Sequence, residues 1–135
     1  MAGMSNFLEG SLGDLLFRNT AYAVPATYVA LYTADPTDAD AGTEVSGGSY
    51  ARILVNNDGV TSPFWKVGVD GLYDNDGLIT FPTATAAWGT ITHVALRDAL
   101  TLGNLLTHGI LDVAKIVGIG DTFQFADGAL NQTLA

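Results

Sequence analysis

The sequence of 135 residues contains no cysteine. Without thiols the chain can form no disulfide, no cysteine nucleophile and no cysteine-ligated zinc site. The same absence means that the sequence does not indicate a redox compartment. We therefore expect stability to come from packing and from association with other molecules.

Charge is also scarce, and most of it is negative. Charged residues make up 14% of the chain, against roughly 25% in an average globular protein. Five Lys and Arg residues face fourteen Asp and Glu, which gives a net charge of −9. Such a chain should repel nucleic-acid backbones and anionic membranes, so we expect neither as a partner. Neighbouring subunits are expected to cover part of the weakly charged surface.

Long apolar runs are missing, although the chain is 48% hydrophobic with a mean hydropathy of +0.29. No segment reaches the roughly 20 consecutive apolar residues of a membrane-spanning helix. The opening MAGMSNFLEGSLGDLLFRN lacks the basic and unbroken apolar regions of a secretory signal, so we expect synthesis in the cytoplasm without sorting. The length and composition predict one compact domain over residues 1–135.

The motifs of common catalytic and ligand sites are absent as well. The sequence has no GxxxxGK[ST], GxGxxG, GxSxG or HExxH pattern. The Asp-rich stretches YDNDG and DPTDADAG do not match a calcium-binding EF-hand loop and are better explained as Asp-Gly turns. We therefore expect no cofactor and no metal site.

Two polar residues in TITHVALRD are the best candidates for a site. His93 and Arg97 lie four apart, so on a strand they share one face with Ile91, while Asp98 points the other way. The other histidine, His108, could pair with His93 in space. This segment alone does not bring a nucleophile, a base and an orienting group together, so we expect no enzyme. As one of five cations among fourteen acids, Arg97 should pair with an Asp, within the fold or across an interface.

Near the N-terminus, leucines recur at three- and four-residue spacing after a candidate cap, Ser5 or Asn6. This spacing predicts a short amphipathic helix over about residues 5–18. Gly10 and Gly13 weaken it by roughly 1 kcal/mol each, so the helix must pack on its own domain or on a neighbour. The candidate interface residues are the helix leucines and one arginine: Leu8, Leu12, Leu15, Leu16 and Arg97.

From residue 26 to 135 the pattern is β-rich. Short apolar runs such as ATYVALYTA, SYARILVN and LITFP are separated by Gly, Asp and Pro clusters every 8 to 14 residues. No second helical pattern appears. The expected fold class is mainly β, an antiparallel β-sandwich or jelly-roll-like domain with a short N-terminal helix.

Several phrases resemble a family of small virion proteins of tailed bacteriophages, often labelled tail-fibre or structural proteins. They are MSNFLEGSLGDLLFRNTAY, YVALYTADPTDADAGTEVSGGSYAR, LITFPTATAAWGTITHVALRDA, GNLLTHGIL and GDTFQFADGAL, and they span nearly the whole chain in order. The resemblance implies a non-enzymatic virion component with a β-rich fold. The segment NNDGVTSPFWKVGVDGLYDNDG departs from it, and a surface excursion there would carry a contact particular to this protein.

Two functions fit this resemblance. The first is a capsid decoration (cement) protein that reinforces the head by binding the major capsid protein. The second is a tail or tail-fibre-associated protein involved in host attachment; the sequence lacks the coiled-coil or collagen-like repeats of a fibre shaft. A glycosidase using paired Asp residues is a much weaker third. In either of the first two cases we expect association with other copies, as a trimer or a dimer.

Overall fold

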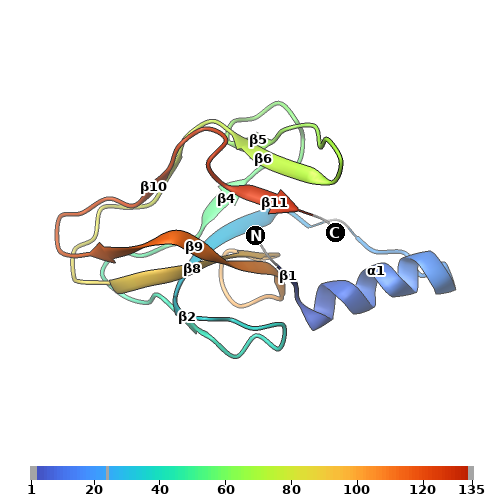
Figure 1. Cartoon of the computed structure of the whole chain (residues 1–135), viewed down its shortest axis with the longest axis horizontal. Coiled ribbons are helices and arrows are strands. Elements are labelled where there is room, and N and C mark those ends of the chain that lie inside the picture. The colour runs from blue at the N-terminus through green and yellow to red at the C-terminus, as the bar shows by residue number, and fades with distance from the viewer. Residues whose placement is uncertain (1–2, 24, 134–135) are drawn as a thin grey trace.

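The computed structural model describes residues 3–23 and 25–133 and confirms a mainly β, antiparallel fold with one short N-terminal helix and no closed barrel (Figure 1). The elements in chain order are β1 (Gly3–Met4), α1 (Asn6–Arg18), β2 (Thr27–Ala34), β3 (Thr43–Glu44), β4 (Ile53–Val55), β5 (Phe64–Trp65), β6 (Leu72–Asp76), β7 (Ile79–Thr80), β8 (Gly89–Arg97), β9 (Leu105–Val117), β10 (Gln124–Phe125) and β11 (Asn131–Thr133).

The main sheet is built on three long antiparallel strands, β2, β8 and β9. Its order is β1-β9-β8-β2-β3, and β4 pairs with the other end of β2. Two small sheets complete the fold, one of β10 and β7 and one of β11, β6 and β5. Strands far apart in sequence therefore meet, and the registers of β2 with β8 and of β8 with β9 decide which side chains share a face.

One face of the main sheet carries the core. Because side chains alternate along a strand, Val29 and Leu31 of β2 point to the same face as Val94 and Leu96 of β8. Residues of the small sheets and their loops pack against them, and the cluster also contains Val45, Val55, Ile79, Phe81, Ala84, Trp88, Ile91, Leu106, Val117, Phe123, Phe125 and Leu130. The side chains that alternate with these along each strand lie on the opposite face of the main sheet.

One residue of β8 lies on the side opposite to that expected from strict alternation. The sequence predicts Ile91 on the face of His93 and Arg97, but Ile91 is fully buried in the core with Val94 and Leu96. The pairing of β8 with β9 shifts register between Ile91 and His93. Such a bulge re-aims the side chains on one side of it, which explains the error.

Helix α1 begins and ends where local signals predict. The side chain of Ser5 caps its N-terminus by accepting a hydrogen bond from the amide of Leu8 at 3.2 Å. At the other end, Asn19 adopts a left-handed conformation and its amide bonds to the carbonyl of Asp14. The predicted range of about 5–18 is confirmed. The helix projects away from the strands (Figure 1).

The segment of residues 56–77, which departs from the family resemblance, forms β5 and β6 and pairs with the C-terminal β11. The segment has three exposed valines, Val60, Val67 and Val69, and the exposed fraction of Val67 is 92%. The segment is thus a surface feature anchored by strand pairing. The contact suggested for it stays a prediction.

Gly48 offers a direct test of the turn before β4. Its φ is +56°, and an added Cβ would lie 2.8 Å from the carbonyl oxygen of Ala86 and 2.9 Å from Nε1 of Trp88. The neighbouring Gly47 has a φ of +74° but open space around it.

We expect Gly48→Ala to lower the free energy of unfolding by about 3 kcal/mol, from backbone strain and from displacement of the bond between Trp88 Nε1 and the Gly48 carbonyl. Gly47→Ala, the matched control, should cost only the strain of about 1 kcal/mol. Urea denaturation of both variants measures this, and equal losses would contradict the close approach.

Candidate functional site

A polar layer covers the face of the main sheet that lies opposite the core. The registers place Tyr32 of β2 opposite His93 of β8, and Ala95 of β8 opposite His108 of β9. Arg97 extends from the end of β8 on the same side, where its guanidinium reaches the hydroxyl of Tyr32. The sequence prediction that His93 and Arg97 share a face is confirmed.

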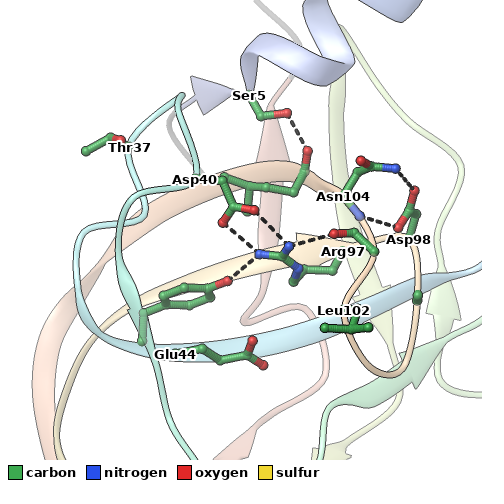
Figure 2. Close-up of polar contacts among 12 residues, drawn as sticks. Ser5, Thr37, Asp40, Glu44, Arg97, Asp98, Leu102 and Asn104 are labelled. Carbon is green, nitrogen blue, oxygen red and sulfur yellow. Dashed lines mark hydrogen bonds and ion pairs between the residues drawn. The ribbon is translucent and has the colours of Figure 1, made fainter.

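Arg97 is the centre of this layer. Its side chain is 8% exposed, and its two terminal nitrogens bind both carboxylate oxygens of Asp40 at 2.8 Å each (Figure 2). They also donate to the hydroxyl of Tyr32 and to the carbonyl of Gly103, each at 2.8 Å. The prediction that Arg97 pairs with an Asp is confirmed, and the partner lies within the fold. One guanidinium thereby joins β2, β8 and two loops.

The electrostatics keep this group charged. Burial by itself would lower the pKa of Arg97, but hydrogen bonds to Asp40 and Tyr32 outweigh it and raise the pKa above its ordinary value. For Tyr32, burial raises the pKa against the opposing effect of Arg97. A charged arginine, a carboxylate and a neutral tyrosine therefore form one hydrogen-bonded unit.

A second arginine, which the sequence reasoning missed, lies beside the first. Arg52 is 7% exposed and binds Glu44 through two bonds of 2.7 Å, from Nε and Nη2. Its remaining terminal nitrogen donates to the carbonyls of Ala99 and Leu102, at 2.7 and 2.8 Å. The signal that could have found the pair is composition, because Glu44 is one of only two glutamates and Arg52 one of only five cations.

The two arginines hold loops whose backbone is strained. Thr37 and Asp40, in the loop after β2, have φ of +55° and +57°, and Leu102, in the loop after β8, has +54°. Non-glycine residues in this region cost of order 1–3 kcal/mol each and persist where surrounding contacts over-determine them. Arg97 bonds to the first loop and both arginines bond to the second. The charged pairs thus fix two loops that would otherwise relax.

Between these loops lies a cleft of about 620 Å³. Its lining includes both ion pairs, Leu102 and the two tyrosines Tyr32 and Tyr50. The carboxylates are the more accessible partners, with Asp40 39% and Glu44 23% exposed. Since the terminal nitrogens of both arginines are already bonded within the fold, the cleft presents carboxylate oxygens and apolar surface rather than free cations.

The two histidines do come together, through a shared carboxylate. His108 Nε2 lies 2.8 Å from Asp38 Oδ1, and its Nδ1 lies 3.6 Å from Asp35 Oδ1. His93 Nε2 lies 3.9 Å from Asp35 Oδ2, and its Nδ1 is 2.8 Å from the hydroxyl of Thr92. These contacts tie the loop after β2 to the sheet. Within residues 3–23 and 25–133, no group of three or more His, Asp or Glu side chains could hold a metal ion.

Asp98, adjacent to Arg97, has a separate and local role. Its carboxylate accepts hydrogen bonds from the amide and side chain of Asn104, at 2.6 and 2.8 Å (Figure 2). It therefore closes the loop after β8 from outside. The prediction that Asp98 and Arg97 point in different directions is consistent with these separate partners.

The helix leucines do not form one covered stripe. Leu8 packs against the core and Leu12 is half-buried, whereas Leu15 and Leu16 are 40% and 74% exposed. Phe17, next to them, is 87% exposed. None of the thirteen described residues of α1 is buried, so the role of these leucines in an interface stays a prediction.

The fold and its polar layer define a small β-rich domain whose buried charges brace surface loops. The chain matches, over residues 3–133, a protein family described as podophage GP4 fiber I protein gp80. It therefore belongs to this family and is a structural protein of a phage virion. A search of curated proteins finds no match. No helix in the described part of the chain is long and apolar enough to cross a membrane.

Removal of Arg97 should destabilise the domain strongly. We expect Arg97→Ala to lower the free energy of unfolding by about 3 kcal/mol, the lower end for a broken buried pair, because water can reach part of Asp40. Arg18→Ala, the control, removes an exposed pair with Asp14 and should cost no more than about 0.5 kcal/mol. Denaturant titration gives both values, and equal small losses would contradict a bracing role for Arg97.

The tyrosine beside Glu44 should make stability fall at alkaline pH. Burial, and then the charge of Glu44, raise the pKa of Tyr50 well above its ordinary value of 10.0. Above pH 10 an unfolded tyrosine loses its proton while folded Tyr50 keeps it, so its contribution is complete below pH 10 and is lost as the pH rises.

We expect this group to contribute a slope of about −1.4 kcal/mol per pH unit to the free energy of unfolding above pH 10. Tyr50→Phe should remove that part of the slope, while Tyr22 and Tyr32, whose pKa values burial also raises, retain theirs. Urea denaturation between pH 8 and 11 measures the slopes. Equal slopes in the variant and the parent would contradict the assignment.

Proposed function

We propose that the protein is a non-enzymatic structural subunit of a phage tail fibre, and not a cement protein of the capsid. The observation that carries the proposal is the family match over residues 3–133, whose description names a fibre protein. The sequence alone favours capsid decoration over a tail-fibre protein. The family description supports the second.

The features that favoured decoration serve a fibre subunit equally well. A weakly charged surface suits burial among neighbouring subunits on a tail as well as on a head. The lack of shaft repeats argues for a compact domain that joins other parts of a fibre. The neighbours we propose are therefore copies of this chain and other tail proteins, in place of the major capsid protein.

The polar layer supports a mechanical role rather than turnover. The terminal nitrogens of both buried arginines form hydrogen bonds with partners inside the fold. Both histidines contact Asp35. Loops fixed in this way keep the shape of a contact surface without having to order when a partner binds, which lowers the entropic cost of assembly.

Phage particles that lack this protein test the proposal. Complementation with the intact gene is the control. A fibre subunit predicts particles that adsorb poorly to host cells but survive heat and osmotic shock like the parent. Normal adsorption combined with fragile heads would instead show a capsid cement and would overturn the proposal.

A further inference from the structure

Within residues 3–23 and 25–133, nothing buries the outer half of α1. Its N-terminal end is anchored, since the hydroxyl of Ser5 donates to the carbonyl of Leu105 and the amide of Asn6 bonds to the carbonyl of Asp38. Its C-terminal end projects away from the strands and carries Leu16 and Phe17, 74% and 87% exposed (Figure 1). A thirteen-residue helix is marginal when isolated, so this end needs a partner.

The two glycines of the helix, Gly10 and Gly13, lower its stability further. Each weakens an exposed helix by roughly 1 kcal/mol relative to alanine. A Cβ added at Gly10 or at Gly13 would meet nothing within 4 Å, so packing within the described chain gives no reason for either residue. Their lack of side chains leaves room for another molecule to approach the helix closely.

An apolar groove of about 540 Å³ lies at the base of the same helix. It is lined by Leu8 of α1, by Leu96 and Leu106 of the main sheet, and by Trp65, Val67 and Tyr73 of the β5–β6 region. It shares no lining residue with the cleft between the two arginines. Leu96 and Leu106 belong to the core cluster, so the groove marks an edge where the small sheets leave the core accessible.

The groove and the end of the helix also carry complementary charges. Asp58 lines the groove, and its carboxylate is held in place by the amides of Val60 and Thr61 at 2.9 Å each. A hydrogen bond from the side chain of Thr61, together with these two amide bonds, lowers the pKa of Asp58 to about 2. Lys66 also lines the groove, but it is paired with Asp74 at 3.4 Å and Asp127 at 3.0 Å, so Asp58 leaves the groove with a net negative charge at neutral pH. Arg18, in the last turn of α1 and 72% exposed, supplies a cation beside Leu16 and Phe17.

We propose that the groove beside α1 binds the C-terminal half of α1 from a second copy of this chain, with Leu16 and Phe17 in the groove and Arg18 near Asp58. The helix of the same chain cannot fill this groove along its length, because its Leu8 forms one wall and its far end points away (Figure 1). The contact joins two different surfaces, so it repeats from copy to copy until the assembly closes, as a trimer or a reciprocal dimer. It names the surfaces by which the proposed fibre subunit would self-associate and rests on that proposal.

Three aspartate substitutions test the contact. Leu16→Asp alters the helix and Val67→Asp alters the groove; both positions are already exposed, so both variants should fold, as circular dichroism checks. Ile116→Asp, on β9 at 80% exposure and outside the groove, makes the same charge change as a control. In sedimentation velocity at about 50 µM, the parent and the control should be oligomers, and the two test variants monomers with affinity weakened at least about tenfold.

Mixing the two monomeric variants gives a decisive result. The Val67→Asp chain has an intact helix and the Leu16→Asp chain an intact groove, so the mixture should form mixed dimers that neither forms alone. A monomeric parent, an oligomer that survives both substitutions, or a mixture that stays monomeric would each overturn the inference. None of these results would bear on the location of the protein, which the adsorption experiment decides separately.

Discussion

The bidentate bond between Arg97 and Asp40 is the interaction on which the outer face of the protein depends. The side chain of Arg97 is 8% exposed, and its guanidinium reaches β2 through Tyr32, one loop through Asp40 and another through the carbonyl of Gly103. An arginine in such a position is costly to desolvate, and hydrogen bonds to its donors offset that cost. The two terminal nitrogens of Arg97 are bonded, whereas its buried Nε is not, and the chain brings Asp40 to the terminal nitrogens by winding the loop after β2 through two left-handed residues, Thr37 and Asp40.

This constraint links the unusual composition to the proposed role. With only five cations, the chain places two inside paired networks that brace loops. The surface is left acidic and, in places, apolar. Exposed side chains of this kind gather on α1, on the β5–β6 segment and along β9, with Leu16, Val67 and Ile116 as examples. A subunit that is rigid inside and has apolar areas outside is suited to assembly with neighbours.

Local signals in the sequence predicted the parts of the structure that local forces decide. The range of α1 followed from Ser5 and the leucine spacing, because a cap and a helical repeat act over a few residues. The β-rich class followed from alternation and turn chemistry in the same way. Ile91 was misplaced because the bulge arises where β8 pairs with β9, a partner that the segment itself does not specify.

For the site, the sequence could predict which types of residue would pair, but not which individual residues. Charge balance indicated that Arg97 would have an Asp partner, but twelve candidates existed, and the fold brought in one that is 57 residues away. The pairing of Arg52 with Glu44 was missed, since neither lies in a recognisable motif. The leucine spacing predicts one apolar stripe along the helix. The fold covers only the N-terminal part of that stripe, because α1 leaves the sheet after its first turns.

A double-mutant cycle between Arg97 and Asp40 tests the central claim most directly. Arg97→Gln, Asp40→Asn and the double variant would be compared with the parent by urea denaturation. If this pair braces the two loops, the cycle should give a coupling free energy of about 2 kcal/mol, within the range measured for residues in direct contact. A coupling near zero, with the two single losses simply adding, would contradict the account.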